Sequence, residues 1–181
     1  IHLPGMFSRA SQVGLILGLA TIVMLMGLAD DRRGLSYVLR LGIEMVLVFV
    51  LIGQDVRLTL LPPFSNIWIS SFITVLWVVG LTNAFNFLDN MDGLSSGVAW
   101  ISSGLFCILM ALVGNYFVAG FLLALMGALT GFLFFNWSPA SIFMGDAGSN
   151  FIGLMIGVIT IVTTFTKPGL PAVKMVAPQL V

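Results

Sequence analysis

Charged residues are scarce in this sequence. Only 8% of its 181 residues are charged, and seven Lys and Arg residues balance seven Asp and Glu residues. Soluble domains carry about a quarter charged residues, so this chain cannot cover a globule with solvated side chains. The composition therefore argues against a soluble monomer. A net charge of zero also leaves no basic surface, so no nucleic-acid partner is expected.

Cysteine and histidine are nearly absent as well. Cys107 is the single cysteine, so an intrachain disulfide is excluded, and its apolar neighbours predict a buried thiol. His2 is the single histidine and lies near the start of the chain, which leaves no Ser–His–Asp set. The pattern G-x-x-x-x-G-K-[ST] does not occur, so the chain is not a P-loop ATPase.

Hydrophobic residues, in contrast, make up 59% of the chain. A membrane-spanning helix needs about 20 mostly apolar residues. Six stretches meet or nearly meet this length: Gln12–Ala29, Tyr37–Ile52, Ser65–Leu81, Gly97–Val113, Tyr116–Phe135 and Ser149–Phe165. A seventh apolar piece begins at Val173. The sequence predicts an all-α, polytopic transmembrane helix bundle, with residues 1–181 forming a single domain because no polar linker divides them. We expect a fragment of a longer protein.

The number of crossings predicts where the polar segments lie. Two spans separate the loop after Ala29 from the segment after Asn83, and two more separate that segment from the loop after Asn136. An even number of crossings places all three on one side of the membrane. Five of the seven acidic residues fall in these segments: Asp30, Asp31, Asp89, Asp92 and Asp146. Basic residues flank both sides equally, and the Arg32-Arg33 pair favours the cytoplasm for this side.

The densest polar segment is Asn83-Ala-Phe-Asn86-Phe-Leu-Asp89-Asn-Met-Asp92-Gly93-Leu94. Its Asn and Asp residues recur every three positions, a spacing that keeps neighbours adjacent on a helix. Such a line at a membrane boundary can present amide and carboxylate groups to one ligand. The plainer alternative is that Asp92 only caps the following helix.

Two further segments carry carboxylates. The pair Asp30-Asp31 follows the first span, and two carboxylates about 5 Å apart repel by roughly 3 kcal/mol, so we expect a proton, a cation, or salt bridges to Arg32 and Arg33. Asp146 lies between glycines just before the sixth span, where it could ligate Mg²⁺ or cap a helix.

Glu44, within the second span, is expected to pair with Arg40 four residues earlier. This leaves carboxylates and asparagines on one membrane face beside a glycine-bearing helix start. The arrangement suits Mg²⁺-assisted phosphoryl transfer at the membrane surface.

Three segments resemble the polyprenyl-phosphate N-acetylhexosamine-1-phosphate transferases. They are Gly27-Leu-Ala-Asp30-Asp31-Arg32, the segment from Asn83 to Leu94, and Phe143-Met-Gly-Asp146-Ala-Gly-Ser149. The resemblance implies a bundle of about ten transmembrane helices with its active site on the cytoplasmic face of the plasma membrane. It implies transfer of N-acetylhexosamine-1-phosphate from a UDP-sugar to polyprenyl phosphate, with release of UMP. The family's histidine-rich loop has no counterpart here, and Asn90 stands where many members have Gly.

The resemblance also implies roles for individual residues. Asp30, Asp31, Asp89 and Asp92 are expected to be catalytic, with one residue of the Asp30-Asp31 pair deprotonating or orienting the lipid phosphate. Asp146 is expected to ligate Mg²⁺, for which Mn²⁺ could substitute, with Asn86 near the metal. Substrate contacts are expected from four residues: Asn83, Asn86, Asp89 and, against the uracil ring, Phe143.

Several alternatives stay open. Within the family, a UDP-N-acetylglucosamine enzyme is preferred to a phospho-N-acetylmuramoyl-pentapeptide transferase. Outside it, the alternatives are a transporter with an acidic cation site and an inactive scaffold subunit. Acids at the ends of spans favour surface chemistry over a transport pathway. The expected partners are the UDP-N-acetylhexosamine, polyprenyl phosphate and the lipid bilayer, and a homodimer is left open.

Overall fold

The computed structural model describes residues 3–58 and 66–164, with side chains for 13–58 and 66–163. These residues form helices and connecting loops without strands, which confirms the predicted all-α class. The helices are α1 (Leu3–Arg33), α2 (Tyr37–Gly53), α3 (Ile67–Leu88), α4 (Leu94–Leu112), α5 (Tyr116–Asn136) and α6 (Gly145–Thr164). Five of them are long and apolar enough to cross a membrane, and α2, with 17 residues, is the exception. The chain is therefore a multi-pass membrane protein.

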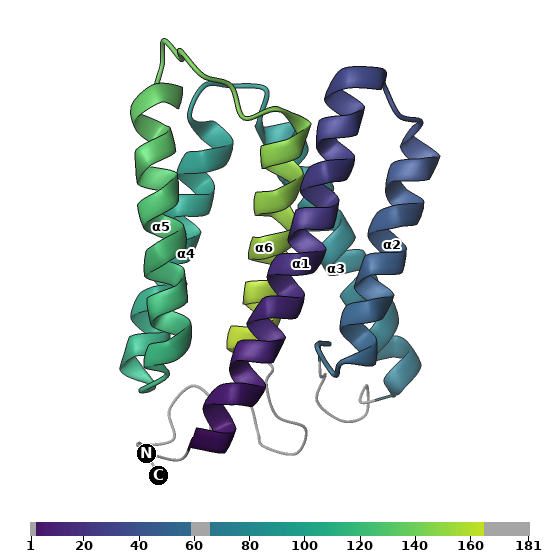
Figure 1. Ribbon diagram of the computed structural model, residues 1–181, viewed down its shortest axis with the longest axis vertical. Helices are drawn as coiled ribbons and strands as arrows, with labels where there is room; N and C mark the ends of the chain where they lie inside the picture. Colours follow the sequence, from purple (N-terminus) through teal and green to yellow (C-terminus); the bar gives the residue numbers. More distant parts are fainter. Residues whose placement is uncertain (1–2, 59–65, 165–181) are drawn as a thin grey trace.

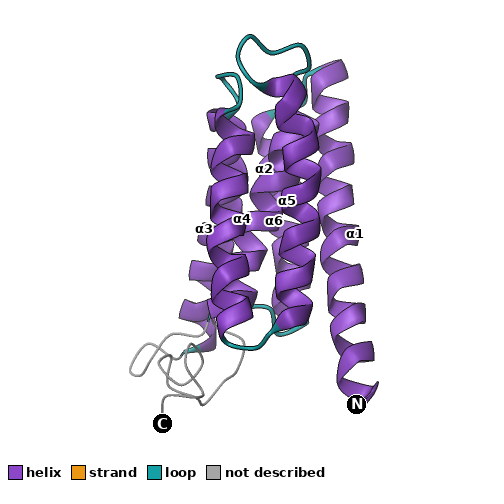
Figure 2. Ribbon diagram, turned by 90° about the vertical axis from the view of Figure 1, so that its left-hand side faces the viewer, coloured by secondary structure: helices purple, strands orange, loops and turns teal. Residues whose placement is uncertain are grey.

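The six helices form an antiparallel bundle. Figures 1 and 2 show α1, α3 and α5 running toward one end, from which α2, α4 and α6 return. The loops that follow α1, α3 and α5 therefore lie together at this end, which we call the loop end. This arrangement confirms the prediction from the number of crossings that the three polar segments share one side.

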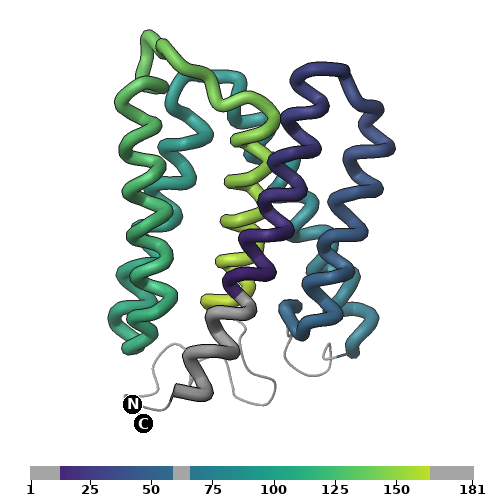
Figure 3. Tube along the Cα trace, in the orientation of Figure 1, coloured from purple at the N-terminus to yellow at the C-terminus, as the bar shows by residue number. Residues whose placement is uncertain are grey.

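Helix α6 occupies the centre of the bundle. It packs against α1, α3 and α4. Figure 3 shows α6 beside α1, although the two helices lie near opposite ends of the chain and of the colour scale. Its spanning window is 61% buried, whereas the corresponding values for the other spanning helices are 33% or less. Most of α6 is thus inaccessible to lipid, and its N-terminus at the loop end is held by its neighbours.

Two glycines allow α6 to approach its neighbours closely. A Cβ atom at Gly153 would lie 2.6 Å from the Cα atom of Thr82 on α3. A Cβ atom at Gly27 on α1 would lie 2.4 Å from the backbone oxygen of Asp146. Side chains larger than hydrogen would separate the helices at both crossings.

The helices extend further at the loop end than the apolar stretches predicted. Helix α1 includes Asp30 and Asp31, α3 continues past Asn86, and α6 begins at Gly145 instead of Ser149. Polar side chains in these last turns bond to neighbouring helices, so the helices need not end at their last apolar residue. Cys107 is buried, as expected. His2, Phe165 and the apolar piece from Val173 lie outside the described residues.

Candidate active site

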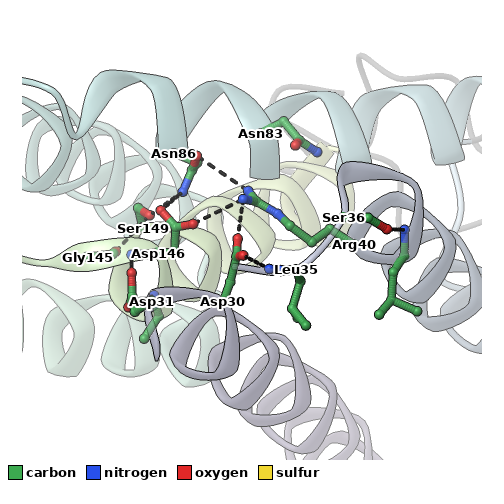
Figure 4. Close-up of polar contacts among 12 residues, drawn as sticks. Asp30, Asp31, Leu35, Ser36, Arg40, Asn83, Asn86, Gly145, Asp146 and Ser149 are labelled. Carbon is green, nitrogen blue, oxygen red and sulfur yellow. Dashed lines mark hydrogen bonds and ion pairs between the residues drawn. The ribbon is translucent and has the colours of Figure 1, made fainter. Parts of the chain in front are cut away.

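Polar side chains from four helices meet at the loop end around one guanidinium. We call Asp30 of α1, Arg40 of α2, Asn86 of α3 and Asp146 of α6 the Arg40 cluster (Figure 4). Nη1 of Arg40 donates to Asp30 Oδ2 and, at 3.0 Å, to Asp146 Oδ2, while Nη2 lies 3.5 Å from Asn86 Oδ1. Asn86 Nδ2 donates to Asp146 Oδ1 at 2.7 Å and to Ser149 Oγ at 3.1 Å. Residues more than a hundred positions apart thus form one network.

The two residues of the aspartate pair have different hydrogen-bond partners. Asp30 is buried, and its Oδ1 accepts the backbone N–H of Leu35. Asp31 points the other way, toward the start of α6, where its two oxygens accept the N–H groups of Asp146 and Ala147 at 3.0 and 3.2 Å. A carboxylate at this position satisfies the first donors of the helix and suits its dipole. Asp31 therefore caps α6 from another helix.

The start of α6 requires glycine. Gly145 has φ +65°, a left-handed conformation that L-residues with side chains rarely adopt. A Cβ atom there would also lie 2.9 Å from Asp31 Oδ2. The glycine before Asp146 thus lets the Asp31 carboxylate approach the first turn of α6.

Asn83 and Glu44 form a separate contact away from the Arg40 cluster. Asn83 Nδ2 donates to Glu44 Oε2 at 2.6 Å and to the carbonyl oxygen of Val79 at 2.9 Å. The expected ion pair between Glu44 and Arg40 was wrong. Arg40 pairs with the carboxylates of Asp30 on α1 and Asp146 on α6, and Glu44 accepts from the Asn83 amide instead. Salt bridges from Arg32 and Arg33 to the aspartate pair were one alternative, but the described ion pair of Asp30 is with Arg40.

Asp89, Asp92 and Phe143 lie in or next to the loops that connect the helices at the loop end. Asp89 ends α3, and Asp92 Oδ2 accepts the backbone N–H of Ala140 at 3.0 Å. The N-cap of α4 is Gly93, so Asp92 does not cap that helix. Phe143 is 73% exposed, which leaves its ring available to a ligand.

Asn136 joins the two connecting loops. Its Oδ1 accepts from the Gly93 N–H at 3.1 Å and from Ser96 Oγ at 3.0 Å, and its Nδ2 donates to the Ile142 carbonyl at 3.0 Å. The side chain is 3% exposed. Asn136 thus fixes the loop that carries Asp92 relative to the loop that carries Phe143.

The pKa of Asp89 is raised from 3.8 to about 6. Burial is the main cause, because it disfavours the charged carboxylate. The carboxylates of Asp146 and Asp31 raise it further, while a hydrogen bond from the Gly145 backbone N–H acts in the opposite direction. The Asp89 carboxyl is therefore close enough to Asp31 and Asp146 for their negative charges to affect its pKa.

The donor atoms of the cluster suit a hard divalent cation. Asp30 and Asp146 offer carboxylate oxygens and Asn86 an amide oxygen, the ligand types that Mg²⁺ prefers. Among the described residues, no three His, Cys, Asp or Glu side chains are grouped closely enough to hold a metal by themselves. A cation here would complete its coordination with water or with oxygens of a bound ligand, as Mg²⁺ commonly does.

Comparison with known proteins identifies the family. The profile described as Glycosyl transferase family 4 matches residues 13–164, most of the chain. The chain belongs to this family. It is 31% identical over 163 residues to a Bacillus subtilis (strain 168) protein named probable undecaprenyl-phosphate N-acetylglucosaminyl 1-phosphate transferase, covering 87% of this chain and 45% of that protein.

Other relatives are similar over shorter regions. A phospho-N-acetylmuramoyl-pentapeptide-transferase of Listeria welshimeri is 36% identical over 75% of this chain and 43% of its own length. That of Limosilactobacillus fermentum is 41% identical over 52% of this chain and 30% of its own length. The chain thus spans less than half the length of these relatives.

Sequence reasoning missed two residues of the site. Arg40 looked like the partner of Glu44, because only the spacing within one helix was considered. The sequence pattern marks Asn136 only as the boundary of the third polar loop. The sequence does indicate both residues. A cation near acidic segments and an asparagine at the end of a span are unusual in so apolar a chain.

Proposed function

We propose that the protein transfers N-acetylhexosamine-1-phosphate from a UDP-sugar to polyprenyl phosphate and releases UMP. The observation that carries this proposal is the convergence of Asp30, Asn86 and Asp146, from three distant segments, at one end of a membrane bundle. A lipid phosphate and a soluble nucleotide sugar can meet only at such a boundary. Membership of glycosyl transferase family 4 supports the same reaction class.

The reaction breaks one phosphorus–oxygen bond and forms another. A phosphate oxygen of the lipid attacks the phosphorus that carries the sugar, and the bridging oxygen leaves with UMP. Asp30 and Arg40 lie together where the lipid phosphate would be oriented, and Asp31 holds the start of α6 in place. Asp146 and Asn86 would hold Mg²⁺, or Mn²⁺, which would stabilise negative charge on the diphosphate oxygens.

We further propose that the protein lies in the plasma membrane with its loop end facing the cytoplasm. Nucleotide sugars are made in the cytoplasm. The Arg32-Arg33 pair at this end supports that orientation. UDP-N-acetylglucosamine is the preferred donor, because a relative that matches 87% of this chain is named an N-acetylglucosaminyl 1-phosphate transferase.

The test is an assay of UMP release with the full-length protein in detergent. Polyprenyl phosphate, Mg²⁺ and UDP-N-acetylglucosamine are supplied, and UDP-N-acetylmuramoyl-pentapeptide replaces the donor in a parallel reaction. UMP release with the first donor is expected. Release with only the second would assign the peptidoglycan reaction. Release with neither, together with cation uptake into vesicles, would favour the transporter.

Phe143→Ala is expected to raise the KM for the UDP-sugar more than it lowers kcat. The exposed ring can stack on uracil, which is remote from the bond that breaks. Steady-state kinetics measure both constants. Phe134→Ala, which removes a comparably exposed ring from α5, is the control, and an unchanged KM in Phe143→Ala would show that the ring does not contact the nucleotide.

The pKa of Asp89 predicts opposite pH dependences for stability and donor binding. The folded pKa of about 6 lies above the ordinary 3.8, so this residue's contribution to stability is present below pH 4 and lost as pH rises through 6. An ionised carboxylate binds nucleoside N–H and O–H donors best, so affinity for UDP-N-acetylglucosamine should fall as pH drops from 7 to 5. Calorimetric titration at both pH values tests this, and Asp89→Asn should show a flatter profile.

A further inference from the structure

We propose that Arg40 competes with the divalent cation for the carboxylates of Asp30 and Asp146. Its guanidinium links these two side chains, and a cation that binds both carboxylates must displace it. This inference rests on the proposed function, because the reaction supplies the reason for a cation at Asp146.

The first argument is geometric. One nitrogen, Nη1, donates to Asp30 Oδ2 and to Asp146 Oδ2, so it lies between the two carboxylates (Figure 4). The second nitrogen, Nη2, faces the Asn86 amide oxygen at 3.5 Å. The three groups best suited to ligate Mg²⁺ therefore all face the same guanidinium.

The second argument is electrostatic. The side chain of Arg40 is 18% exposed and that of Asp30 is 7% exposed, so solvent screens their charges only partly. Two ionised carboxylates facing each other there repel, and a positive charge between them offsets that repulsion. Arg40 supplies it without a metal. With a metal bound, the same arginine would be a like charge next to the cation.

The third argument concerns access. The side chain of Asp146 is 32% exposed, so a hydrated cation can reach its oxygens from solvent. The arginine stem is long enough to let the guanidinium move away while remaining at the loop end. The phosphates of the two substrates bring negative charge to the same place and would give the displaced guanidinium a new partner.

The experiment measures the affinity of the full-length protein for Mn²⁺ by electron paramagnetic resonance, without substrates. Arg40→Met keeps an unbranched side chain but removes the charge and the donors. Its dissociation constant for Mn²⁺ is expected to be at least about tenfold lower than that of the wild type, because a like charge near the cation is gone. UMP release should nevertheless fall. Arg33→Met removes an exposed arginine at the same end and should change Mn²⁺ affinity less than about threefold.

A second variant covers the case in which Arg40→Met does not fold. Arg40→Lys keeps the charge but cannot bridge three groups with one planar fork, so its Mn²⁺ affinity should lie between those of the wild type and Arg40→Met. Unchanged or weaker Mn²⁺ binding in the variants would overturn the competition. If UMP release by the wild type is Mg²⁺-dependent in that case, the proposed function survives. Tighter Mn²⁺ binding in the variants, together with no UMP release by the wild type, would support the competition and reject the function.

Discussion

Asp146→Asn is expected to lower kcat for UMP release by at least about a hundredfold, the order of effect seen when a charge-stabilising group is removed. The substitution keeps the size of the side chain and removes its charge. The Asp146 carboxylate accepts from both Arg40 and Asn86, so it is held in one orientation at the start of α6. An amide in its place binds Mg²⁺ more weakly and loses the ion pair with Arg40. Steady-state assays at saturating Mg²⁺ measure the loss.

The neighbouring aspartates provide the comparison. Asp31 uses both oxygens to cap α6, so Asp31→Asn should lower thermal stability, and its activity should change in proportion to the folded fraction. Polyprenyl phosphate should still bind to Asp146→Asn, because its tail lies in lipid. If Asp146→Asn retained near-normal turnover while Asp30→Asn or Asp31→Asn abolished Mg²⁺ dependence, the cation would belong to the aspartate pair.

Much of the architecture could be predicted because the membrane simplifies the problem. Long apolar stretches have to become helices, since lipid offers no partners for backbone N–H and C=O groups. Counting crossings then places Asp30, Asn86 and Asp146 on one side without any knowledge of packing. The structure confirms this placement, and with it the idea that distant polar segments form one cluster.

The partners of individual side chains could not be predicted in the same way. Spacing along one helix paired Arg40 with Glu44, but a long side chain at a helix end can reach other helices equally well. Its direction depends on where the ends of α1 and α6 lie beside α2, and the contact of Gly27 with Asp146 fixes the distance between α1 and α6. The sequence shows the glycine, but only the fold shows its neighbour. The same holds for Asn136, whose three partners lie on segments that meet only after folding.

Gly27→Ala is expected to lower kcat by about a hundredfold, although Gly27 touches no substrate. The added Cβ atom would lie 2.4 Å from the Asp146 carbonyl oxygen and 2.7 Å from the Ala147 Cα atom. These are backbone atoms of the first turn of α6, so no side-chain rotation can relieve the clash. The turn has to move by roughly 1 Å, and a misplacement of that size can reduce turnover by about a hundredfold.

Gly18→Ala is the matched control on the same helix. A Cβ atom there would meet nothing within 4 Å, and alanine favours the helix over glycine by about 0.5–1 kcal/mol. Gly18→Ala should therefore keep full activity and melt at the same or a slightly higher temperature. Gly27→Ala should instead lose activity and lower the melting temperature, because overpacking costs about 1–3 kcal/mol. Wild-type turnover in Gly27→Ala would mean that α1 and α6 can separate without disturbing the Arg40 cluster, and that the close crossing serves packing alone.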